Sequence, residues 1–104
     1  MSVKKKEKLR LSIDTTDNLK TVVKLGGKTV VKNYQDPREQ ELLGLIKKVL
    51  EETNTGLNQI KKIRVKTGPG SFTGIRVGVA VANALAWVLK IKVNGQTMVT
   101  PVYD

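Results

Sequence analysis

The 104-residue sequence contains no cysteine and no histidine. Without cysteine there can be no disulfide and no thiol chemistry, and without histidine the commonest general base and metal ligand is missing. Most nucleophilic mechanisms therefore lose their usual activating group, and only carboxylates and backbone groups remain as metal ligands. We accordingly expect no catalytic residue, no metal site and no cofactor of the chain's own.

Long apolar runs and aromatic residues are also scarce. No stretch reaches the ~20 apolar residues that cross a membrane, and the charged N-terminus lacks the apolar run of a signal peptide. We expect a cytoplasmic protein without a membrane contact. The few aromatic residues are too scattered along the sequence to form a platform on which bases stack.

Acidic residues are outnumbered, with 9 Asp and Glu against 19 Lys and Arg, a net charge of +10. Such a charge attracts polyanions, of which RNA is the obvious cytoplasmic one. The cations are nevertheless dispersed, and their one tight run is Lys4-Lys5-Lys6 with Lys8 and Arg10. We expect residues 1–7 to be a frayed basic tail. Two interpretations stay open: a charge that keeps a small protein in solution, and a nonspecific tRNA contact through phosphates.

The length suits one domain spanning residues 1–104. Apolar residues recur with the spacing of strands or helices in successive segments, and Gly26-Gly27 is typical of a tight hairpin. The predicted strands are 8–15, 19–25, 28–34, 61–67 and a fifth from 92–93 with 97–99; the predicted helices are 38–52 and 71–90. The order β-β-β-α-β-α-β predicts an α/β fold with a mixed five-stranded sheet and both helices on one side.

Small residues recur every four positions in the segment 70–86, as Gly70, Gly74, Gly78, Ala82 and Ala86. Glycine costs ~1 kcal/mol against alanine inside a helix, so this ridge indicates close approach to another element, either the protein's own sheet or a partner. Both predicted helices are apolar over more of their surface than one sheet can cover. We predict that they contact a partner through Leu42, Leu45, Ile46, Val49, Gly74, Ile75, Arg76, Gly78, Val79, Ala82 and Asn83.

A glycine-rich turn at residues 67–74 joins a predicted strand to a predicted helix. Backbone N–H groups at such a place can bind an anion, although Ser71 capping a purely structural turn explains the pattern equally well. The carboxylate and hydroxyls that end the first strand allow the same two interpretations. The candidate anion or phosphate site comprises Asp14, Thr15, Thr16, Gly68, Gly70 and Ser71.

Two segments resemble a known family. Ile13-Asp14-Thr15-Thr16 resembles the opening motif of the TsaB (YeaZ) family, and residues 68–78, Gly-Pro-Gly-Ser-Phe-Thr-Gly-Ile-Arg-Val-Gly, closely resemble its signature. The resemblance implies a single actin-like (ASKHA, ribonuclease H-like) lobe, with the second lobe of the family absent. Members of that family are catalytically silent partners of a TsaD-type transferase. Together with TsaE they help to make threonylcarbamoyladenosine in tRNA.

The resemblance further implies a helix-bundle interface, formed with the transferase or, when the chain is alone, in a homodimer. Any ATP and magnesium would be bound by the partner, because one lobe has no interdomain cleft. We therefore expect a scaffold subunit and not an enzyme. Two alternatives remain: a small basic RNA-binding module, and a phosphate-binding enzyme whose cleft is rebuilt by homodimerisation.

Overall fold

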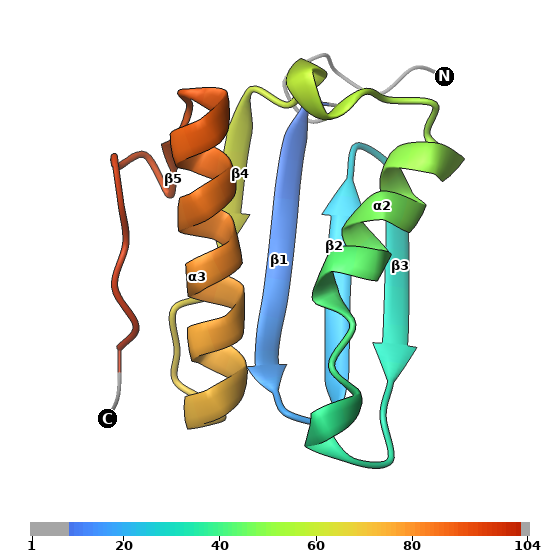
Figure 1. The fold of residues 1–104 in the computed structure, drawn as a ribbon, viewed down its shortest axis with the longest axis vertical. Helices are drawn as coiled ribbons and strands as arrows, with labels where there is room; N and C mark the ends of the chain where they lie inside the picture. The colour runs from blue at the N-terminus through green and yellow to red at the C-terminus, as the bar shows by residue number, and fades with distance from the viewer. Residues whose placement is uncertain (1–8, 103–104) are drawn as a thin grey trace.

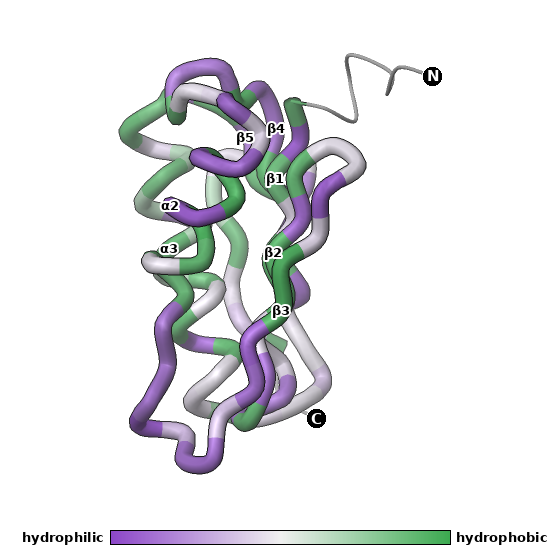
Figure 2. Tube along the Cα trace, turned by 90° about the vertical axis from the view of Figure 1, so that its right-hand side faces the viewer, coloured by the Kyte–Doolittle hydropathy of each residue, from purple (hydrophilic) through white to green (hydrophobic). Residues whose placement is uncertain are grey.

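The computed structural model describes residues 9–102, so the predicted frayed tail at 1–7 lies outside the described residues. One mixed sheet has the strand order β3-β2-β1-β4-β5, and both helices cover the same face of it (Figures 1 and 2). The elements are β1 Arg10–Asp17, β2 Lys20–Leu25, β3 Lys28–Asn33, α2 Leu42–Glu52, β4 Lys62–Val65, α3 Phe72–Leu89 and β5 Lys92–Val93. This arrangement confirms the predicted fold class and the predicted order of elements.

The sheet is built from an antiparallel half and a parallel half. β1, β2 and β3 form a meander, and Leu25 pairs with Lys28 across the two-residue turn Gly26-Gly27. Gly26 has a φ of 61°, a conformation that glycine adopts without steric cost. β4 pairs in parallel with β1, and β5 in parallel with β4, so the two crossovers carry α2 and α3.

The core is the single layer between the helices and the sheet. α2 lies over β2 and β3, and α3 over β1, β4 and β5 (Figure 1). Alternate strand residues point into this layer, as the period of a strand requires. The core residues are Leu11, Ile13, Val23, Leu25, Val30, Ile63, Val65 and Val93 from the sheet, Leu42, Leu45, Ile46, Val49, Ile75, Val79, Ala82 and Ala86 from the helices, and Ile60 and Val99 from the connections.

The ridge of small residues, which starts at Gly70 just before α3 and continues along that helix, packs against the protein's own sheet. A Cβ atom built on Gly70 or Gly74 would lie within 3.0 Å of the backbone oxygen of Thr16 or Thr15, and one on Gly78 equally close to the Thr15 hydroxyl. Real Cβ atoms essentially never come so close. The ridge therefore sets the short distance between α3 and β1, which was one of the two interpretations of its spacing.

Several predicted boundaries were wrong, among them the end of β4, which is Val65 and not residue 67. β1 continues to Asp17, because Thr15 stays extended and buried under α3. The first helix begins at Leu42 after a separate 3₁₀ turn at Pro37–Glu39, since Gln40 has a non-helical backbone (φ −45°, ψ 126°). The Gln40 side chain accepts hydrogen bonds from the Thr21 and Tyr34 hydroxyls. Residues 97–99 are not a strand, although Val99 is buried.

The helix α3 is long and apolar enough to cross a membrane by length and composition. A core helix passes the same test, and the face of α3 that carries Gly74, Gly78 and Ala82 packs on the sheet. The finding is thus weak evidence for a membrane span.

Candidate functional site

Two motifs far apart in the sequence meet where β1 and β4 end. The backbone N–H of Ser71 donates to the carbonyl oxygen of Thr16 at 2.7 Å, and Gly70 lies directly against Thr16. The glycine turn therefore joins the end of β1 at the carboxyl edge of the two parallel strands. The structure thus brings together most of the residues of the predicted anion site.

Most polar groups at this edge of the sheet already form hydrogen bonds within the protein. The Thr15 hydroxyl, fully buried, donates to the carbonyl oxygen of Gly74 at 2.5 Å. The Ser71 hydroxyl accepts from the Gly74 N–H at 3.2 Å, so the predicted helix cap is confirmed. Gly68 packs against the carbonyl of Val102, whose N–H donates to Thr67. These bonds account for the motif structurally, and phosphate binding stays a prediction.

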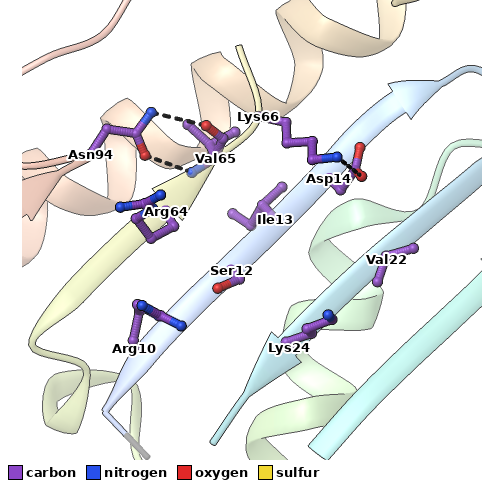
Figure 3. Close-up of a pocket in the computed structure, with 10 residues that line it drawn as sticks. All are labelled: Arg10, Ser12, Ile13, Asp14, Val22, Lys24, Arg64, Val65, Lys66 and Asn94. Carbon is purple, nitrogen blue, oxygen red and sulfur yellow. Dashed lines mark hydrogen bonds and ion pairs between the residues drawn. The ribbon is translucent and has the colours of Figure 1, made fainter. Parts of the chain in front are cut away.

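Asp14 differs from its neighbours because it points to the face of the sheet that the helices leave open (Figure 3). Its burial opposes ionisation, but hydrogen bonds from the Thr16 hydroxyl and N–H, with the charge of Lys66 at 3.5 Å, outweigh this effect and lower the pKa of Asp14. Asp14 is therefore an anion at neutral pH. Among residues 9–102 no three acidic side chains gather as metal ligands.

Most of the predicted partner-contact residues are buried inside the protein, where a partner could not reach them. Leu42, Leu45, Ile46 and Val49 of α2 are core residues. So are Ile75, Val79 and Ala82 of α3, and Gly74 and Gly78 are buried against β1. The amide of Asn83 is hydrogen-bonded to both backbone groups of Val99, at 2.8 and 3.0 Å. Of the predicted set only Arg76 is exposed, because the spacing that predicted a contact face belongs to the core face.

The outward face of the helices carries different apolar residues. Trp87 and Val88 of α3 are 80% and 65% exposed, and Leu43 of α2 is 66% exposed. Phe72 is also exposed and lies under the guanidinium of Arg76, which is 5.2 Å from the ring centroid. The ridge of small residues could have indicated this face. Once the ridge is placed against the sheet, the residues on the opposite side of α3 must face outward.

The sheet order, the two helices on one face and the glycine turn beside β1 define a single lobe of the actin-like class. A family model described as TsaD, tRNA N6-adenosine threonylcarbamoyltransferase, matches residues 15–96. The chain therefore belongs to this family, and within it to the TsaB (YeaZ) group that the residues of the glycine turn resemble.

Curated relatives and solved structures agree with this assignment. The chain is 36% identical over 80 residues to the tRNA threonylcarbamoyladenosine biosynthesis protein TsaB of Haemophilus influenzae, covering 74% of this chain and 34% of that protein. It is 31% identical over 88 residues to TsaB of Bacillus subtilis, covering 81% and 38%. The structure of YeaZ from Pseudomonas aeruginosa superposes with a TM-score of 0.68 at 26% identity, covering 89% and 42%. The chain thus spans less than half of the length of these relatives.

Proposed function

We propose that the chain is a non-catalytic cytoplasmic subunit in the threonylcarbamoyladenosine modification of tRNA, and that it binds a TsaD-type transferase. The observation that carries this proposal is the apolar outward face of α3. Arg76 is the only charged residue of that 18-residue helix. A surface helix facing water normally carries several charges on its outer side, so this face is suited to protein contact.

The contact surface is defined by exposed residues of both helices. On α3 they recur every four positions as Phe72, Arg76, Ala80, Ala84 and Val88, with Trp87 beside them. The alanines would let a partner helix approach closely, and Trp87, Phe72 and Leu43 offer large apolar groups of the kind that dominate interface energies. This outward face replaces the buried set predicted from the sequence.

The chemistry of the chain supports a role without catalysis. With no histidine in the sequence, Ser71 lacks the general base that usually activates a serine, and its hydroxyl caps α3. Any ATP and magnesium that the modification uses would be held by the transferase. TsaE would join as a further partner, and a second copy of the chain would occupy the outward face when the transferase is absent.

The test is light scattering after gel filtration of the chain mixed with the TsaD-type transferase of its own organism. The variant Ala84→Glu places a charge on the outward face and should abolish the complex without changing the circular dichroism, because Ala84 is exposed. The matched control Thr29→Glu adds the same charge to the exposed edge strand β3, on the far face of the sheet, and should leave the complex intact.

The outcomes separate the alternatives. A complex that survives Ala84→Glu would contradict the proposed contact surface. A homodimer that ignores the transferase would contradict the proposed partner. Nucleotide binding measured by calorimetry with magnesium present would contradict the non-catalytic role and favour a cleft rebuilt between two copies. Charges at Ile46 or Val79 are unsuitable probes, because these side chains are only 5% and 4% exposed and such variants would unfold the domain.

A further inference from the structure

The face of the sheet turned away from the helices concentrates positive charge. Even-numbered residues of four strands point to it, because their odd-numbered neighbours are buried beneath the helices. The cations on this face are Arg10, Lys20, Lys24, Lys62, Arg64 and Lys92 of the strands, and Lys66, which directly follows β4. We call this set the cationic sheet face. Several of its members line an open hollow of about 500 Å³ over β1, β2 and β4 (Figure 3).

The sheet register places like charges directly beside one another. Arg10 pairs with Lys62, and Lys62 pairs with Lys92, so one row of three cations crosses β1, β4 and β5. Lys24 and Arg64 flank Ser12 in the next row. Like charges opposite each other on neighbouring strands destabilise a sheet, so these rows oppose folding unless an anion offsets them.

Little within the protein offsets the charge. Among the strand residues only Asp14 and Asp17 of β1 bring a carboxylate to these cations, Asp17 lying opposite Lys20 in the register. Within residues 9–102 only Lys66 of the cationic sheet face has an ion-pair partner. Five of the nine acidic residues of the sequence lie instead in the segment 36–52, before and along α2. The two sides of the molecule therefore differ in charge as well as in apolar character.

We propose that the cationic sheet face binds the phosphate backbone of RNA. Its rows lie ~7 Å apart along the strands and its charged columns span roughly 14 Å across four strands, a flat array that suits an extended polyanion better than one small ion. A second copy is a poor occupant, because two such faces repel each other. That the RNA is tRNA rests on the proposed function.

The experiment measures binding of a fluorescein-labelled, unmodified tRNA transcript by anisotropy at several salt concentrations. The double variant Lys24→Glu/Arg64→Glu reverses two cations of the face. It should weaken binding at low salt roughly 10-fold or more and reduce the salt slope by about 1.5, since each phosphate contact contributes ~0.7–0.9 to that slope. The control Lys32→Glu/Lys47→Glu makes the same change in net charge at exposed residues on the helix side and should bind almost normally.

The outcomes also distinguish this inference from the proposed function. Equal loss in both double variants would show that net charge alone attracts the RNA and would overturn the inference, as would no binding at low salt. Loss of the transferase complex in Lys24→Glu/Arg64→Glu would make the face a protein-docking surface, which also overturns it. Ala84→Glu should keep full tRNA affinity while losing the transferase, so that each proposal can fail alone.

Discussion

The same substitution, glycine to alanine, should have opposite effects at three helical positions of this protein. Alanine is favoured over glycine in a helix interior by ~1 kcal/mol, and this gain is common to Gly44, Gly74 and Gly78. What differs is the space available. A Cβ atom on Gly44 of α2 meets nothing within 4 Å, whereas on Gly74 and Gly78 of α3 it would overlap Thr15 of β1.

The expected change in the free energy of unfolding depends on which atom the new Cβ would meet. Gly44→Ala should raise the free energy of unfolding by up to ~1 kcal/mol. At Gly78 the overlapping atom is the Thr15 hydroxyl, held by its bond to Gly74 and by the stiffness of a buried β-branched side chain. Overpacking costs about 1–3 kcal/mol, and the helix gain of ~1 kcal/mol offsets part of this. Gly78→Ala should therefore lower the free energy of unfolding by up to ~2 kcal/mol. Gly74→Ala should lose at least as much, because it meets the backbone oxygen of Thr15.

A second substitution separates the two clashes. Thr15→Ala removes the hydroxyl that opposes a side chain at position 78 but leaves the backbone oxygen that opposes one at position 74. In the Thr15→Ala background Gly78→Ala should therefore become stabilising, while Gly74→Ala should stay destabilising. Urea unfolding of each single and double variant measures these differences. If Gly78→Ala costs as much with Thr15→Ala as without it, close packing of α3 on β1 is not what requires the glycines.

Two further predictions concern groups that the fold uses directly. Asn83→Ala removes both hydrogen bonds to Val99, so hydrogen exchange at the Val99 amide should accelerate much more than at the amides of β1; equal acceleration would mean that Asn83 supports the whole domain and not this segment. The pKa of Asp14 is lowered in the folded state, so its ionised form stabilises the fold at any pH above the unfolded-state pKa near 3.8. This stabilisation is lost as the pH falls through the lower pKa of the folded state. Asp14→Asn should therefore reduce stability at pH 6, and the difference should narrow below pH 3.8 in thermal melts; a constant difference would contradict the assigned role.

The sequence was sufficient to predict the order of elements because each carries its own period. Buried residues alternate with more exposed ones in β1, β2 and β4. Gly26-Gly27 closes a hairpin, and Ser71 caps α3. The predicted ends of elements were wrong where a tertiary contact determines the end. Gln40 interrupts the first helix to accept hydrogen bonds from Thr21 and Tyr34, and no local pattern indicates either partner.

The candidate surfaces were harder to predict because each depends on which face of an element is covered. The spacing of Gly74, Gly78 and Ala82 marks a contact face of α3 but is the same whether the neighbour is β1 or a partner. The cations of the open face looked dispersed because they are separated by up to 82 positions, from Arg10 to Lys92. Only the register of β1 with β2 and β4, and of β4 with β5, places them in rows.

The short strand β5 has a consequence for how the protein can assemble. The Asn94 side chain, at the end of β5, donates to the carbonyl oxygen of Val65 and accepts from its N–H, both at 2.9 Å, and so acts as one more residue of that strand. Beyond it Val93 bridges back to Gln96, and the opposite edge strand β3 carries Lys28 and Lys32. Such edges discourage the addition of another strand. The two edges of the sheet thus oppose its extension by a strand of another chain, which leaves the helix face and the open sheet face for contact with copies or partners.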